Sequence, residues 1–369
     1  MDGIARRLSA RALVVAVAVA SGTLAAPLIG ATAFGATTNR YAAADRAMTQ
    51  RVRDDGLPGG VLLVASTANA SSSSSAGHTL HEKRFGSMRA STVIPVASAS
   101  KWLTSATLMT FVDDGSVRLD DPVSKYLPEF RGAKATITLR QLLSHTTGLP
   151  WDDCVSDPST TLRACASSIA HGGDPTTAPG TAFSYSSVGF QVAGAVIEQL
   201  SGQSFERTFE ARVATPLGMT HTRFDRSGSS RTENPTPAAS VTSSVDDYAR
   251  FLAMLASDGL HDDTRVLTAE SVAEIERDQV AGLDTSRDAA VQITGIPTYG
   301  LGVWRDEVDA HDGIRVVSGS GALGFYPWID RVHDTYGIVA VADANSGPEH
   351  AVPASQRIAR QLWNVAARH

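Results

Sequence analysis

Apolar residues at helical spacing occupy the middle of the chain. From Ser98 onwards they recur at steps of three and four residues, and the pattern stops at Gly115. Because nearly every face of this segment is apolar, we predict a buried helix. Two similar helices are expected, one from Val188 to Gly202 and one that Ser244 caps and that ends at Gly259. Shorter helical patterns cover residues 41–55 and 354–367.

Strand-like runs lie on both sides of this helical stretch. Residues 59–66 form a buried run opened by a glycine turn, and residues 81–86 follow a serine-rich patch. The last third holds four more candidate strands, at residues 299–304, 314–317, 325–329 and 336–342.

These runs predict an α+β protein. A single antiparallel sheet would form from both chain ends, with flanking helices and an inserted all-helical subdomain. We assign residues 40–97 and 240–369 to the sheet subdomain and residues 98–239 to the helical subdomain. The active site is expected in the cleft between them.

The N-terminus has the features of an export signal. Arg6, Arg7 and Arg11 precede an apolar run over residues 12–20, and small residues follow. We expect residues 1–36 to be a signal peptide that is removed, leaving residues 37–369 as a single domain of a secreted or extracytoplasmic protein. A retained membrane anchor is the alternative, but the uninterrupted apolar run is shorter than the roughly 20 residues that a span requires.

The composition limits which classes of partner the protein can bind. The net charge of −6 argues against binding to nucleic acid or to an anionic membrane surface, which both attract basic proteins. A small neutral or weakly polar substrate fits this charge better than either of them. The two cysteines, Cys154 and Cys165, are predicted to form a disulfide in an exported chain. Their spacing is wrong for a zinc ribbon, and no metal ion or cofactor is expected. The oligomeric state is not assigned.

The sharpest chemical signal is a serine followed three residues later by a lysine at the start of the buried helix. Residues three apart share a helical face, so the Ser98 hydroxyl and the Lys101 amine can meet. A lysine among apolar neighbours loses hydration, which lowers its pKa and lets it act as a base towards serine. In the alternative, Ser98 or Ser100 caps the helix and Lys101 is solvated. Lysine is rare in this chain, and a solvated lysine in an apolar run would be costly.

A second candidate, Tyr185, precedes the helix that starts at Val188. A tyrosine in such a place is more often a packed aromatic than a catalyst. Its order and separation relative to Ser98 and Lys101 favour the catalytic interpretation.

Three motifs in this order resemble those of class C β-lactamases, DD-peptidases and the esterases related to them. They are Ser98-x-x-Lys101, Tyr185-x-Ser187 and the glycine-rich segment from Ser318 to Phe325. The loop from Leu142 to Pro150 is also similar to a loop of that family. The resemblance spans roughly residues 59–342 and implies a β-lactamase-like fold.

The resemblance also implies roles for individual residues. Ser98 would form the acyl-enzyme, Lys101 and Tyr185 would share the acid and base work, and Ser187 would orient the substrate or Lys101. Ser320 and Gly321 would line the substrate site. The oxyanion hole would consist of the backbone N–H groups of Ser98 and Ala322. His145, in the matching loop, is interpreted as structural.

This chain departs from the antibiotic-hydrolysing pattern at two places. Ser187 stands where β-lactamases usually carry asparagine, and the third motif has no lysine or histidine to bind a substrate carboxylate. We therefore predict a serine hydrolase that cleaves a carboxylic ester or amide through an acyl-serine. A weak β-lactamase or DD-peptidase is the alternative within the enzymes. A catalytically silent homologue that binds peptidoglycan or a partner protein is the alternative outside them.

Overall fold

The computed structural model describes residues 39–67, 77–224, 233–309 and 313–368. The predicted signal peptide and the serine-rich tip of the first hairpin lie outside these residues. Residues 40–369 form one compact unit. In the described part of the chain, no helix is both long and apolar enough to cross a membrane.

A six-stranded antiparallel sheet confirms that both chain ends build one sheet. Its order is β2-β1-β11-β10-β9-β8, so strands from the first 90 residues pair directly with strands from the last 70. Val61 of β1 faces Ala340 of β11 across the join. The strands are β1 (Gly59–Ser66), β2 (His78–Gly86), β8 (Trp304–Val308), β9 (Ile314–Ser318), β10 (Tyr326–Asp330) and β11 (Thr335–Ala340).

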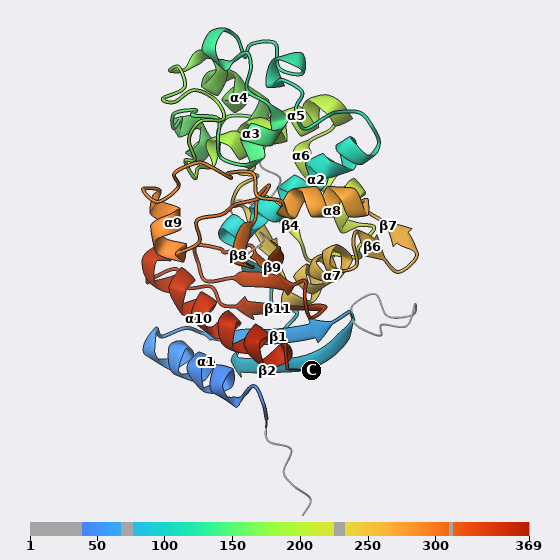
Figure 1. Ribbon diagram of the computed structural model, residues 1–369, viewed down its shortest axis with the longest axis vertical. Coiled ribbons are helices and arrows are strands. Elements are labelled where there is room, and N and C mark those ends of the chain that lie inside the picture. The colour runs from blue at the N-terminus through green and yellow to red at the C-terminus, as the bar shows by residue number, and fades with distance from the viewer. Residues whose placement is uncertain (1–38, 68–76, 225–232, 310–312, 369) are drawn as a thin grey trace, which may run out of the picture. The chain divides into compact units, whose positions relative to one another are not determined.

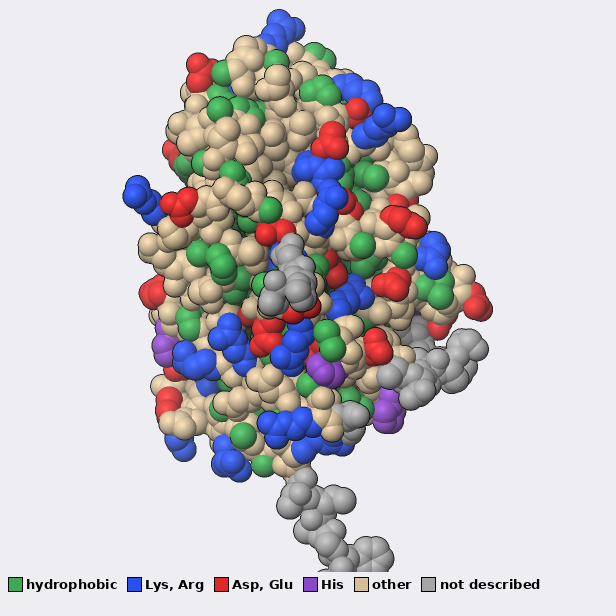
Figure 2. All heavy atoms as spheres, in the orientation of Figure 1, with side chains coloured by type: hydrophobic (Ala, Val, Ile, Leu, Met, Phe, Trp, Pro, Cys, Tyr) green, Lys and Arg blue, Asp and Glu red, His purple; other side chains and the backbone are tan. Residues whose placement is uncertain are grey.

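Both faces of this sheet are covered by helices. Leu62 and Val64 of β1 pack with α1 (Ala42–Asp54) and α10 (Pro348–Ala366), which lie side by side along one face (Figure 1). Val61 and Leu63 point to the opposite face and join the larger core around α2 (Ser100–Asp113). This alternation follows from the two-residue period of a strand. Figure 2 shows acidic and basic side chains interspersed on the face that α10 covers.

Of the remaining helices, α5, α6 and α8 pack directly against α2, while α4 packs on α5 and α9 packs on α10. Ser244 accepts a hydrogen bond from Asp247 N–H and caps α7, as predicted. The helices are α3 (Leu139–Leu143), α4 (Leu162–His171), α5 (Val188–Ser201), α6 (Phe205–Phe209), α7 (Val245–Ala256), α8 (Ala269–Glu276) and α9 (Ala289–Thr294). Short strands are β3 (Ile94–Pro95), β4 (Arg223–Phe224), β5 (Val241–Ser243), β6 (Leu260–His261) and β7 (Thr264–Arg265). Single helical turns cover Ala97–Ala99, Val123–Lys125, Gly132–Lys134, Asp153–Ser156 and Glu210–Ala214.

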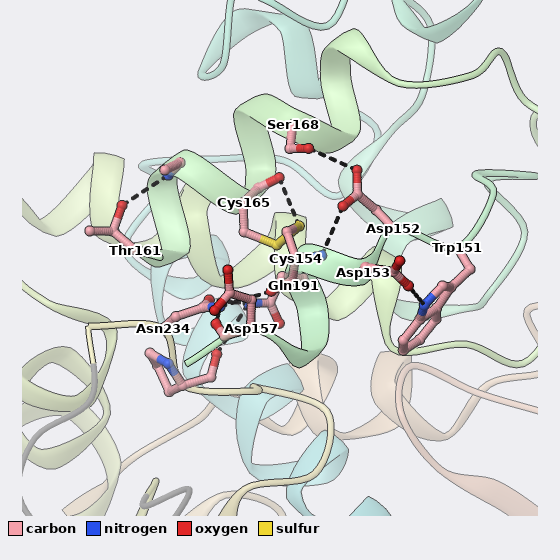
Figure 3. Close-up of a disulfide and its surroundings, with 12 residues drawn as sticks. Trp151, Asp152, Asp153, Cys154, Asp157, Thr161, Cys165, Ser168, Gln191 and Asn234 are labelled. Carbon is pink, nitrogen blue, oxygen red and sulfur yellow. Dashed lines mark hydrogen bonds between the residues drawn. A yellow bond between two sulfur atoms is a disulfide. The ribbon is translucent and has the colours of Figure 1, made fainter. Parts of the chain in front are cut away.

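A disulfide joins Cys154 to Cys165 and ties the turn Asp153–Ser156 to α4 (Figure 3). Asp152 braces the same junction, accepting hydrogen bonds from Cys154 N–H and from the Ser168 hydroxyl, each at 2.9 Å. The predicted pairing is therefore present in the structure, where it orders a local segment of the helical region.

Two predicted elements differ from the structure. Residues 299–304 were expected to form a strand, but only Trp304 belongs to β8. Gly302 adopts a φ of +83°, and a Cβ there would lie 2.8 Å from Lys101 O. This close contact with α2 prevents the segment from forming the predicted strand of the sheet. The last helix begins at Pro348, six residues before the predicted start, because proline fits the first turn of a helix.

Candidate active site

The segment before α2 presents Ser98 in a constrained turn. Ala97 has a φ of +48°, which a residue with a Cβ rarely adopts. The buried Ser100 hydroxyl fixes this turn by donating to Ala97 O at 2.6 Å and accepting from Val241 N–H at 3.0 Å. Tyr248 adds a hydrogen bond to Ala99 O at 2.9 Å. These contacts fix the backbone just before α2, where Ser98 is partly exposed.

Lys101 lies directly beneath Ser98. Its Nζ is 3.1 Å from Ser98 Oγ and 3.2 Å from Ala238 O, and only 1% of the residue is exposed. Burial lowers the pKa of Lys101 to about 7, because charging the amine would require desolvating a cation. The solvated-lysine alternative is therefore wrong, and α2 has no side-chain cap from Ser98 or Ser100. At neutral pH a large fraction of the amine is uncharged and can accept the Ser98 proton.

Tyr185 completes the group from the loop before α5. Its hydroxyl shares a hydrogen bond with Ser98, and its ring lies 4.5 Å from Lys101 Nζ. Burial raises the pKa of Tyr185 to about 12, so the hydroxyl stays protonated at neutral pH and acts as a donor. Asp288 accepts from Tyr185 N–H at 2.8 Å, and Trp304 stacks on the ring. The tyrosine is thus both packed and in contact with Ser98.

His145 supports the Tyr185 loop from below. Its Nδ1 accepts from Ser186 N–H at 3.2 Å, its carbonyl accepts from Ser184 N–H at 2.9 Å, and its ring packs on Tyr185. Burial, with a smaller contribution from Lys101, holds the pKa of His145 well below its usual value. A neutral imidazole that accepts a backbone N–H is consistent with the structural role predicted for it.

Ser187 occupies the position just before α5 without capping that helix. Ser186 Oγ accepts the Val188 N–H at 3.1 Å instead. Ser187 is partly exposed beside Tyr185, so its hydroxyl can face a ligand.

The glycine-rich segment is a tight hairpin, and only Ser318 belongs to β9. Gly319 N–H and Gly321 N–H donate to Pro327 O and Phe325 O, and Gly324 N–H donates to Gly321 O. With Gly324 at a φ of +86°, this is a three-residue hairpin loop that ends on a left-handed glycine. The N–H of Ala322 lies outside this set of hydrogen bonds.

The hairpin packs against the backbone on both sides of Ser98. A Cβ placed on Gly319 would lie 3.8 Å from Ala99 Cα, and one on Gly321 would lie 2.3 Å from Val96 O. Glycine is therefore required at position 321 for the two backbones to approach this closely. This contact places the turn that carries Ala322 against the segment that leads to Ser98, and Ser320 is buried within the same hairpin.

A model of the Beta-lactamase family matches residues 44–362, which include this whole group. The chain belongs to the β-lactamase family. Penicillin-binding protein 4 of Amycolatopsis lactamdurans is 32% identical over 304 residues, covering 67% of this chain and 75% of that protein. A β-lactamase-like protein of Bacteroides dorei superimposes with a TM-score of 0.75 at 31% identity, covering 88% of this chain and 98% of that one.

Esterases share the fold of this β-lactamase family member. A family VIII carboxylesterase superimposes with a TM-score of 0.68 at 19% identity, over 89% of this chain and 98% of that one. Membership of this family indicates a hydrolase of the serine acyl-transfer type.

Several supporting residues of the site carry no recognisable sequence signal. Ala238, Val241 and Tyr248 contact the start of α2 from more than 130 residues away in the chain. The positive φ of Ala97 gives no sequence signal either, since alanine has no intrinsic preference for positive φ. Asp288 could have been identified as the cap of α9, but its bond to Tyr185 N–H depends on the tertiary fold.

Proposed function

We propose that this member of the β-lactamase family is an exported carboxylic-ester hydrolase that works through an acyl-serine. The observation that carries the proposal is the buried Lys101 amine at 3.1 Å from the Ser98 hydroxyl, with a pKa that burial lowers to about 7. Lys101 accepts the Ser98 proton as Ser98 Oγ attacks the ester carbonyl. The N–H groups of Ser98 and Ala322 would stabilise the negative charge on the carbonyl oxygen.

The remaining steps use the same three side chains. Collapse of the tetrahedral intermediate breaks the ester C–O bond, and Tyr185 donates a proton to the departing alcohol while Lys101 returns a proton to Tyr185. Water then attacks the acyl-serine with Lys101 as the base. This releases the carboxylic acid and restores the Ser98 hydroxyl.

The third motif favours a neutral ester over a β-lactam. Ser318 donates to Asp306 Oδ2 at 3.0 Å, on the face of the sheet that α10 covers. A Cβ on Gly319 would lie 3.1 Å from Trp102 Cε3, so the indole occupies the space beside that position. Arg315 is paired with Glu307. A carboxylate substrate would therefore lack the charge-assisted bond that offsets its desolvation, about 1.5–3 kcal/mol.

The test compares p-nitrophenyl butyrate with nitrocefin on the mature protein. We expect a higher kcat/KM for the neutral ester, and a loss of roughly 10⁴-fold in Ser98→Ala. Ser91→Ala, at an exposed serine of the preceding segment, is the matched control and should retain full activity. A tenfold preference for nitrocefin would show that another cation binds the carboxylate and would overturn the ester assignment. Undiminished ester hydrolysis by Ser98→Ala would overturn the nucleophile.

A further inference from the structure

A buried polar cluster lies directly behind the turn that carries Ala322. Ser355 of α10 donates to Gly324 O at 2.5 Å and accepts from Arg51 Nη1 at 2.5 Å. Asp343, just beyond β11, donates its N–H to Leu323 O at 2.9 Å. The cluster therefore holds the carbonyl groups of the two residues that follow Ala322.

The three side chains of the cluster are almost fully buried. Arg51 is 6% exposed, Asp343 is 1% exposed and Ser355 is completely buried. They come from α1, from the loop after β11 and from α10, so Arg51 is nearly 300 residues away in the chain from the other two. Burying an arginine and an aspartate costs free energy unless several polar partners compensate their charges. These side chains therefore cannot move without losing the contacts that compensate their burial.

Arg51 supplies the positive charge that the acidic groups here require. Its Nε lies 3.4 Å from Asp55 Oδ2 and its Nη2 lies 3.8 Å from Asp343 Oδ2. Asp55, Asp343 and His350 are also close enough together to hold a metal ion. With the guanidinium beside both carboxylates, we interpret the cluster as an ion-paired support and not as a metal site.

The turn is pressed onto this support. A Cβ on Gly324 would lie 2.7 Å from Arg51 Nη2 and 3.2 Å from Ser355 Oγ. On the other side, Gly321 is against Val96 O. The turn is thus confined between the cluster and the segment that leads to Ser98.

We propose that Arg51, Ser355 and Asp343 are positioning residues that set the Ala322 N–H for stabilisation of the oxyanion. This inference rests on the proposed acyl-serine chemistry at Ser98. Oxyanion donors must lie within about 2.7–3.1 Å of the oxygen as charge develops, so a shift of the turn weakens binding of the transition state more than binding of the substrate. Loss of the Ser355 hydroxyl removes the bond to Gly324 O and the bond from Arg51 Nη1.

The test measures the rate at which a fluorophosphonate probe labels Ser98, together with ester kcat and KM. For Ser355→Ala we expect labelling and kcat to fall about tenfold, with KM changed less than twofold. Arg51→Met, which removes the hydrogen bond to Ser355, should reduce both in the same way. Ser271→Ala removes another buried serine, one that donates to Asp113 at the far end of α2, and should lower stability without changing either rate.

The outcomes separate this proposal from the ester assignment, because the probe reports on the oxyanion site whatever the natural substrate is. Labelling of Ser355→Ala or Arg51→Met within twofold of the wild-type rate, in protein shown to be folded, would overturn the positioning role. If Ser271→Ala lost as much rate as Ser355→Ala, the loss would reflect general destabilisation of the protein. That result would also overturn the positioning role. If Ser355→Ala does not fold, the labelling rate of Arg51→Met becomes the deciding measurement. Arg51→Lys, which keeps the charge, should label faster than Arg51→Met.

Discussion

At the scale of single residues, burial explains how Lys101 can act as the proposed base. Its amine contacts Ser98 and Ala238 O, and the desolvation cost lowers its pKa to about 7. The uncharged amine is the form that accepts a proton, so kcat/KM should rise about tenfold per pH unit below 7 and level off above it. Ester hydrolysis measured from pH 5 to 9 tests this. A kcat/KM that still rises tenfold per pH unit at pH 9 would contradict the lowered pKa of Lys101.

The same burial makes Lys101 a cost to stability. The folded-state pKa of about 7 is below the ordinary 10.5, so the folded protein binds fewer protons than the unfolded chain between these values. Stability should therefore rise with pH across that window, and the penalty is fully present below pH 7. We expect Lys101→Met to be inactive and about 1–3 kcal/mol more stable at pH 7, as measured by urea unfolding.

Lys134 provides the matched control for that substitution. It is also buried, but its ammonium donates to the carbonyls of Ile169, Ala170 and Gly172 at 2.8–2.9 Å, at the end of α4. Lys134→Met leaves these acceptors without their donor and should destabilise the protein. A loss of stability in both variants would contradict the assignment of a desolvation penalty to Lys101.

At the scale of elements, the segment before β8 depends on one glycine. Gly302 has a φ of +83°, and a Cβ there would lie 2.6 Å from Ser105 Oγ and 2.8 Å from Lys101 O. Gly302→Ala should therefore cost about 2–3 kcal/mol and also lower kcat, since the displaced contact is the backbone of Lys101. Gly282→Ala, at a φ of +81° in open space, is the control for the dihedral strain alone. Equal losses in the two variants would exclude the packing contribution.

The disulfide is a local element with a separable effect. It joins cysteines 11 positions apart, between a single helical turn and α4, so its removal should lower stability by about 2–3 kcal/mol. The double variant Cys154→Ser, Cys165→Ser should keep the wild-type kcat, because neither cysteine contacts the Ser98 group. Thiol counting in denatured, non-reduced protein secreted by its native host should give no free thiol. Two free thiols in that material would contradict the pairing.

At the scale of the whole molecule, the N-terminal segment bears on where the protein acts. We propose that residues 1–36 direct export and are removed, on the basis of the arginines and the apolar run that follows them. N-terminal sequencing of protein exported by its native host should find a new terminus just after Ala33 or Ala36. An intact Met1 in exported material would contradict cleavage and favour the retained anchor.

The sequence by itself determined the periodic elements and the order of the chemical groups. Apolar spacing predicted α2, α5 and α7 within a few residues, because a buried helix needs apolar side chains at fixed steps. Ser98 and Lys101 were predicted to meet because three residues make nearly one helical turn, and their contact is local.

Only the tertiary structure decided how those groups are supported. The pKa of Lys101 depends on how completely distant segments exclude water from it, and the direction of the Ala322 N–H depends on the turn of a hairpin held from α1 and α10. Ser318 faces α10, and the space beside Gly319 belongs to Trp102. Side-chain direction at a strand end, positive φ at Ala97 and burial of a charge all arise from contacts between residues far apart in the chain, which local pattern does not encode.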